Sequence, residues 1–248
     1  MPRYFIEVAY MGTRYSGFQE QLNANTIQAE VTRALKIFFN KEFSLTGSSR
    51  TDAGVHALQN FFHFDVDTEI NKSAVYNLNA LLPYDISVKN IFETAPGAHC
   101  RFDAIARTYH YQIIRFKNPF YFDRAYYYPF AVNVDVLHEM AAAIIQFSDF
   151  TSFSKKNTHV KSFNCNIEYS RWIVEDDLLR YEVKANRFLR GMVKGLVGTM
   201  LRIAKNNHGI DELKKIFEKK DSAAADFSVS SDGLILIAIE FNNDITKI

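Results

Sequence analysis

The side chains best suited to chemistry lie in one short polar segment, residues 50–57, which reads RTDAGVHA. It combines a guanidinium at Arg50 with a carboxylate at Asp52, between segments that are otherwise strongly apolar. Gly47 and Gly54 flank these groups, and glycine permits the sharp backbone turns that such a loop requires. Thr-Asp-Ala-Gly alone is also typical of a tight turn in which the aspartate bonds to its own backbone. A carboxylate placed between apolar segments at a core edge is, alternatively, a group available for chemistry such as nucleophilic catalysis.

Two apolar segments that alternate as strands do, residues 43–47 and 58–66, must position this loop. The first half of the chain reads as strand, helix, strand, strand, helix, strand. Its other elements are a strand at 3–10, a helix at 27–39 capped by Thr26, a helix at 73–81 that ends before Pro83, and a strand at 86–93. The loop that carries Asp52 therefore connects the second and third strands.

The same order of elements begins again after a break at residues 94–104. The expected elements are a strand at 105–115, a helix at 135–147, strands at 161–174 and 178–185, helices at 188–205 and 211–219, and a strand at 234–241. Both halves have the split-βαβ order of ferredoxin-like domains. We therefore predict an α+β fold of two ferredoxin-like halves, residues 1–98 and 99–248, joined into a mixed, largely antiparallel sheet flanked by helices. A central cleft between the halves would hold the active site.

Length and composition narrow the classes of protein to which the chain can belong. It has 248 residues, 48% of them hydrophobic, so it can bury a full core without disulfides. Its two cysteines, Cys100 and Cys165, have no metal-binding spacing, and its apolar runs are too short to span a bilayer. The start of the sequence leaves no room for a signal peptide, so we expect a cytoplasmic protein without a membrane segment. Because the net charge is only +1, any nucleic-acid surface must come from local basic patches.

Three segments carry a resemblance to a known family. Residues 50–57 resemble the signature of the tRNA pseudouridine synthase A family at eight consecutive positions. Residues 104–111 (AIARTYHY) resemble that family's Ala-x-Ala-Arg-x-Tyr-x-Tyr strand, and residues 188–194 (FLRGMVK) resemble its Phe-x-x-x-Met-Val-Arg helix. Weaker matches extend the resemblance over nearly the whole chain, at residues 10–19, 149–153 and 232–234.

The resemblance implies roles for four residues. Asp52 would be the catalytic nucleophile, and Tyr109 would stack on the target base and is a candidate acceptor of the final proton. Lys194 stands where the family usually has an arginine that faces the catalytic aspartate, and lysine supplies the charge without the bidentate fork. Arg50 would contact the RNA substrate. His56, beside the entering strand, is expected to make a structural hydrogen bond rather than to act in catalysis.

The resemblance further implies the activity, isomerisation of uridine to pseudouridine in the anticodon stem-loop of tRNA, at positions 38, 39 and 40. Whether the route is acylal or glycal-type stays open. This rearrangement is redox-neutral, and the sequence has no metal-ligand spacing, Gly-rich phosphate loop or dinucleotide fingerprint, so no metal or nucleotide cofactor is expected. The family also implies a homodimer that binds one tRNA across both subunits.

Two other functions fit part of the pattern. A catalytically silent RNA-binding module would share the split-βαβ order, but its characteristic Lys/Arg-Gly-Phe strand motifs are absent from the sequence. A glycoside or nucleoside hydrolase would need a second positioned carboxylate, and the loop offers only Asp52. The aromatic segment 116–130 has a composition that can stack bases, but we expect it to pack in the core and at an interface.

Overall fold

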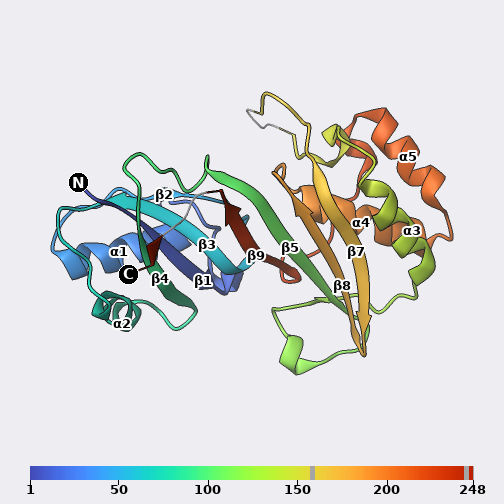
Figure 1. Ribbon diagram of the computed structural model, residues 1–248. Helices are drawn as coiled ribbons and strands as arrows, with labels where there is room; N and C mark the ends of the chain where they lie inside the picture. Colours follow the sequence, from blue (N-terminus) through green and yellow to red (C-terminus); the bar gives the residue numbers. More distant parts are fainter. Residues whose placement is uncertain (157–159, 243–245, 248) are drawn as a thin grey trace. The chain divides into compact units, whose positions relative to one another are not determined.

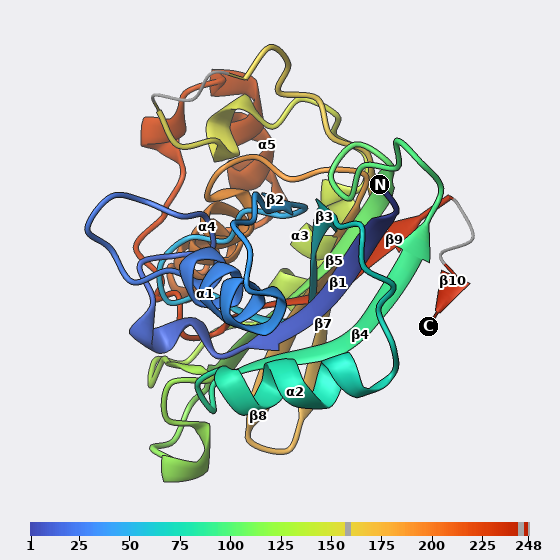
Figure 2. The same ribbon diagram turned by 90° about the vertical axis from the view of Figure 1, so that its left-hand side faces the viewer.

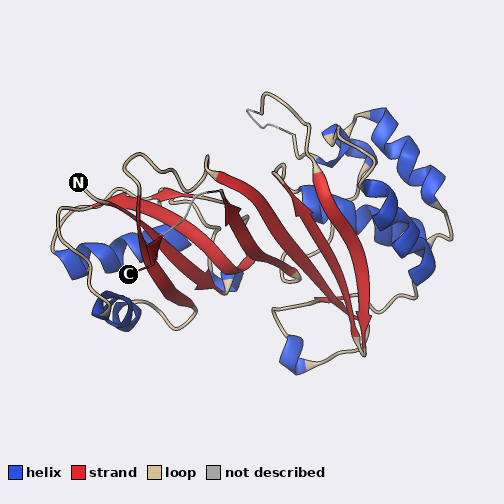
Figure 3. Cartoon of the chain, viewed as in Figure 1, coloured by secondary structure: helices blue, strands red, loops and turns tan. Residues whose placement is uncertain are grey.

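The structure, a computed structural model, describes residues 1–156, 160–242 and 246–247 (Figure 1). The chain folds as two compact units. Unit 1 contains Met1–Ile105 and Leu236–Ile248, and unit 2 contains Ala106–Ile235. The fold class is α+β, as predicted, with strands and helices in separate layers of each unit (Figure 3). The division into residues 1–98 and 99–248, and the cleft between them, stay predictions; the compact units differ from that division because the end of the chain belongs to unit 1.

Unit 1 has the strand arrangement of a split-βαβ domain. Its central strand β1 is antiparallel to β3 on one side and to β4 on the other, and β2 pairs with β3. The order β4-β1-β3-β2 is extended at the β4 edge by β10. The bounds are β1 Arg3–Tyr10, β2 Thr46–Gly47, β3 His56–Asp65, β4 Ile86–Thr94 and β10 Thr246–Lys247.

Two helices of unit 1 lie on the same side of its sheet, α1 (Ile27–Phe39) and α2 (Ser73–Leu81) (Figure 2). Residues 4–8 of β1 are all buried, so both faces of this central strand are covered and not only the face against the helices. The predicted cap of α1 is confirmed, because the Thr26 hydroxyl accepts a hydrogen bond from the Ala29 backbone N–H at 3.3 Å. A short 3-10 helix, η1 (Gly12–Arg14), follows β1 and precedes this cap.

Unit 2 is built on three long antiparallel strands with β8 (Leu178–Ala185) in the middle. Its neighbours are β5 (Ala104–Ile114) and β7 (Ile167–Glu175), and the short strand β6 (Tyr126–Tyr127) adds a parallel pairing to β5. The other elements are α3 Val134–Ile144, α4 Met192–Lys205, α5 Ile210–Lys219, and the 3-10 helices η2 Pro119–Tyr121, η3 Thr151–Phe153 and η4 Ser222–Ala224. The last long strand, β9 (Leu234–Phe241), begins in unit 2 and continues in unit 1.

Three predicted boundaries are wrong for local reasons. The helix predicted from residue 188 begins at Met192, because Gly191 adopts a left-handed conformation with φ of 74°. The strand predicted from residue 161 begins at Ile167, because the preceding residues pair with a loop: Cys165 N–H donates to Ser148 O at 2.9 Å. Only Thr46 and Gly47 of the strand predicted at 43–47 pair in the sheet.

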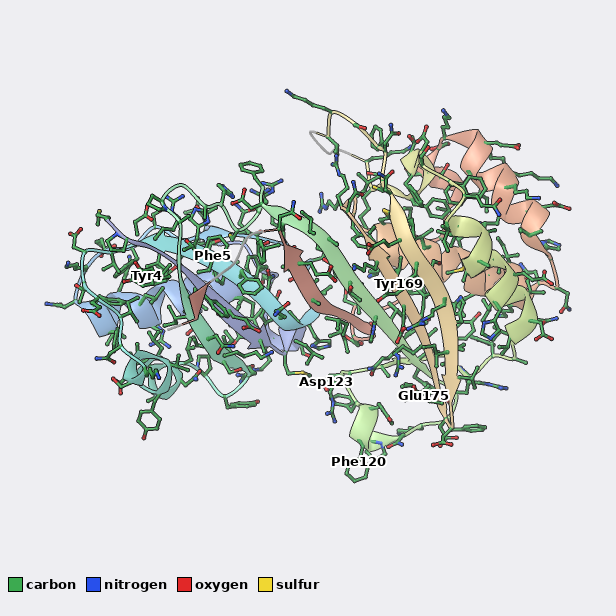
Figure 4. All side chains as sticks on the ribbon, in the orientation of Figure 1. Tyr4, Phe5, Phe120, Asp123, Tyr169 and Glu175 are labelled. Carbon is green, nitrogen blue, oxygen red and sulfur yellow. The ribbon has the colours of Figure 1, made fainter. Side chains whose placement is uncertain are left out.

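The aromatic segment 116–130 is only partly in the core. Ala125 is buried and packs with Ile114, whereas Phe120 and Phe122 are 80% and 79% exposed. The side chain of Phe120 points away from the ribbon of its loop (Figure 4). These two rings are therefore not part of the core, and the expectation that the segment also packs at an interface stays a prediction.

One buried histidine gives unit 1 a pH-dependent stability. His63 on β3 lies 3.2 Å from the Cys100 sulfur through its Nδ1 atom and is only 7% exposed. Burial lowers the pKa of His63 from its ordinary 6.5 to about 4, and the nearby charges of His99 and Arg3 act in the same direction. The imidazole therefore protonates more readily in the unfolded chain than in the folded one.

We expect this difference to destabilise the protein as the pH falls from about 6.5 towards about 4. The stabilisation is fully present above the unfolded-state pKa and is lost progressively below it. His63→Gln should make the fall in the free energy of unfolding between pH 7 and pH 4.5 smaller by roughly 2–3 kcal/mol. Urea unfolding at both pH values checks this, and equal falls for variant and wild type would contradict it.

Candidate active site

The signature loop, residues 48–55, joins β2 to β3 and is tied to the rest of unit 1 by backbone hydrogen bonds. At its start, Ser48 N–H donates to Phe61 O on β3 at 2.8 Å. At its centre, Phe18 N–H donates to Thr51 O at 3.1 Å. These bonds fix the backbone on either side of Arg50 and directly before Asp52.

Helix η1 lies directly against the end of the signature loop. A Cβ atom built on Gly12 would lie 2.0 Å from Val55 O, so only glycine fits at this contact. The Gly12 N–H donates to His56 Nδ1 at 3.0 Å, and the imidazole is 2% exposed. The structural hydrogen bond predicted for His56 is thus confirmed.

Burial alternates over residues 49–52 of the signature loop. Ser49 and Thr51 are buried, whereas Arg50 is exposed and Asp52 is half-buried. The backbone after Asp52 turns back on itself, since Val55 N–H donates to Asp52 O at 3.2 Å. The loop therefore buries its three hydroxyl residues, Ser48, Ser49 and Thr51, and leaves Asp52 partly exposed.

The segment at residues 10–19, a weaker sequence match, packs against the signature loop and is itself held by Asp85. The Tyr15 hydroxyl and the Arg14 Nε both donate to the buried carboxylate of Asp85, each at 2.7 Å. Burial, followed by this hydrogen bond, raises the pKa of Tyr15, so its hydroxyl stays protonated. The backbone O of the same tyrosine accepts a bond from Gly54 N–H at 3.4 Å, which links the Asp85 cluster to the loop.

Tyr109 lies on β5 in unit 2, in register with Val183 of β8. It is 8% exposed, and the edge of its ring meets the ring of Phe188 at a centroid distance of 5.0 Å and an angle of 80°. Tyr111, two residues further along β5, is fully buried and donates its hydroxyl to Ser230 O at 2.6 Å. Tyr111 is therefore a core residue with a tethered hydroxyl, whereas Tyr109 is slightly less buried.

Lys194 occupies the first turn of α4, also in unit 2, and its side chain is partly exposed. Its ammonium nitrogen donates to the Ser231 hydroxyl oxygen at 3.3 Å. Ser231 lies directly before the weak match at residues 232–234, and the sequence offered no other signal for it. This hydroxyl limits the positions that the flexible lysine side chain can adopt.

The described residues contain no group of three or more His, Cys, Asp or Glu side chains placed to hold a metal ion. In that same part of the chain, no helix is both long enough and apolar enough to cross a membrane. Cys100 and Cys165 are both buried and form no disulfide.

Comparison with known proteins identifies close relatives over the full chain. A family model described as tRNA pseudouridine synthase matches residues 6–103 and 147–242. The chain is 41% identical to tRNA pseudouridine synthase A of Bacteroides fragilis, with 98% of each chain covered. It is 37% identical to the protein of that name from Parabacteroides distasonis, covering 99% of this chain and 98% of the relative, and 32% identical to that from Staphylococcus aureus, covering 98% and 96%.

The α+β fold, the fixed loop that presents a carboxylate and the family match over most of the chain define a pseudouridine synthase. The relatives narrow this class further. The chain belongs to the tRNA pseudouridine synthase A family.

Proposed function

We propose that the protein isomerises uridine to pseudouridine in tRNA, at positions 38, 39 and 40 of the anticodon stem-loop. The observation that carries this proposal is the signature loop, whose backbone is held by hydrogen bonds from β3 and from residues 15–18 while Asp52 is partly exposed. Membership of the family supplies the reaction class. A rigid loop that presents one carboxylate is suited to covalent or electrostatic catalysis at a sugar or a base.

The reaction breaks the bond between N1 of uracil and C1′ of ribose and forms a bond between C5 and C1′. The base must leave its stack, turn, and reattach, and C5 loses a proton while N1 gains one. We assign the Asp52 carboxylate as the nucleophile that assists the first bond cleavage and holds one fragment during rotation. Because no electrons are gained or lost overall, the residues of the chain need no redox partner.

We assign three further residues to the substrate. Tyr109 would stack on the extruded uracil and is the candidate acceptor for the C5 proton, since flipped bases are commonly held by aromatic rings. Arg50, which is exposed beside the nucleophile, would bind a phosphate of the displaced backbone. Lys194, held by Ser231, would supply a positive charge that favours the ionised carboxylate.

The proposed substrate also bears on assembly and location. We propose that the enzyme acts in the cytoplasm as a homodimer that binds tRNA across both subunits. With a net charge of +1, one chain carries little overall attraction for a polyanion, and two copies would double the number of local basic patches.

Release of tritium from tRNA labelled at uridine C5 tests the proposed function, because every conversion frees one C5 hydrogen. We expect the wild-type protein to release tritium from such a tRNA, and to release none when uridines 38, 39 and 40 are replaced by cytidine. Release from the replaced tRNA would overturn the positional assignment. Free uracil as product would indicate a hydrolase, and binding without release would indicate a silent RNA-binding module.

A further inference from the structure

Strand β3 carries one amide at a fully buried position. Asn60 has no exposed surface, and its side chain contacts the backbone of Ser49 in the signature loop twice. Its Nδ2 donates to Ser49 O at 2.8 Å, and its Oδ1 accepts from Ser49 N–H at 3.3 Å. Burying an amide is unfavourable unless it is hydrogen-bonded, so an apolar residue would serve the core better. The hydrogen bonds to Ser49 explain why an amide and not an apolar side chain occupies this position.

The same amide connects to a second point of the signature loop. Asn60 Nδ2 also donates to the Tyr10 hydroxyl at 3.1 Å, and this hydroxyl shares a hydrogen bond with the Thr51 hydroxyl at 2.8 Å. Tyr10 is 4% exposed, and its ring packs against that of Phe18 at 5.9 Å. The hydrogen bonds of Asn60 and Tyr10 therefore hold Ser49 and Thr51, the buried neighbours of Arg50.

We infer that Asn60 and Tyr10 are positioning residues that set the direction in which Asp52 leaves the loop. Thr51 directly precedes Asp52, so a change in the Thr51 backbone is transmitted to the carboxylate without an intervening residue. Tyr10 lies on β1 and Asn60 on β3. Side chains on strands are held more rigidly than side chains on another loop would be. The catalytic part of this inference rests on the proposed function, whereas the clamping of the loop does not.

Tyr10→Phe tests the inference with the loss of a single oxygen atom, because the ring and its packing remain. We expect kcat for tritium release to fall about 10- to 100-fold with little change in KM, since a misplacement of about 1 Å costs about that factor. Thr51→Val should give the same loss, and the double variant should be no slower than either single one. Thr51→Ser, which keeps the hydroxyl, should restore most of the rate.

Tyr181→Phe is the matched control. Tyr181 is also fully buried, and its hydroxyl shares a 2.8 Å hydrogen bond with the Ser170 hydroxyl in unit 2. We expect it to lower the melting temperature about as much as Tyr10→Phe does, with kcat unchanged. If Tyr10→Phe keeps kcat within about twofold of wild type, or if both variants lose activity in proportion to stability, the inference is overturned.

Amide hydrogen exchange separates this inference from the proposed function. We expect the amides of residues 50–55 to exchange several-fold faster in Tyr10→Phe than in wild type, and at the wild-type rate in Tyr181→Phe. If the wild type releases no tritium but the exchange result holds, the proposed function fails and the clamping stands. If loop exchange is unchanged in Tyr10→Phe, the clamping itself is wrong.

Discussion

Asp52→Asn should abolish tritium release from C5-labelled tRNA while leaving the fold and tRNA binding largely intact. Asparagine has nearly the same shape as aspartate but lacks the negative charge and the nucleophilic carboxylate. Loss of a nucleophile removes stabilisation made only in the transition state, so we expect kcat to fall by at least about 10³-fold. The hydrogen bond from Val55 N–H to the backbone O of residue 52 does not involve the side chain and should survive.

The measurement combines initial rates of tritium release with filter binding of the same tRNA. Asp67→Asn is the matched control, because Asp67 is an exposed carboxylate in the same unit and has no assigned role. We expect this control to retain wild-type kcat and binding. An Asp52→Asn enzyme with more than about a tenth of the wild-type rate would refute the nucleophile assignment.

The second large effect is expected from Gly12→Ala. The added methyl group would lie 2.0 Å from Val55 O and 2.6 Å from Val55 C, which are backbone atoms that cannot move aside as a side chain can. The variant must displace either η1 or the end of the signature loop. Overpacking of this kind should lower the free energy of unfolding by about 3 kcal/mol. The shift of the loop should also reduce kcat about 100-fold.

Urea unfolding and tritium release together check this prediction. Gly209→Ala is the control, because beyond its chain neighbours no side chain or other backbone segment lies within 4 Å of the added methyl group, and the residue has an ordinary φ of −110°. Its stability should stay within about 0.5 kcal/mol of wild type. A Gly12→Ala protein with wild-type stability and rate would contradict the prediction, because it would show that η1 or the signature loop can shift without loss of stability or activity.

The helices and most strands could be predicted because their signals are local. The α1 helix follows a 3.6-residue apolar pattern behind the Thr26 cap, and both were recognisable in the sequence. The start of α4 was predicted too early, because the apolar pattern continues through Gly191 although its left-handed backbone excludes a helix there. For the segment 116–130, composition did not indicate which rings lie outside the core, because aromatic content alone does not show which way a loop turns each ring.

The candidate site was predictable only where it is contiguous in sequence. Residues 50–57 identified the loop, and His56 proved to be structural, as expected. The clamp by Asn60 and the support by Ser231 were not predicted, because Asn60 and Tyr10 are 50 positions apart and Lys194 and Ser231 are 37 apart. Pairings of this kind depend on strand register and loop geometry, which a single sequence does not reveal.

The discontinuous composition of unit 1 has a consequence for synthesis on the ribosome. Unit 1 draws on residues from both ends of the chain, whereas unit 2 is continuous. The Phe241 ring packs on Phe61 at 5.1 Å, and Ile239 N–H donates to Gln59 Oε1 at 2.9 Å. Strand β3, which is synthesised early, is therefore completed by residues of β9, which are synthesised about 180 positions later. Domains generally fold as units while the chain emerges. The strand β3 that follows the signature loop therefore gains these partners only after residues 239–241 have left the ribosome, long after its own residues have emerged.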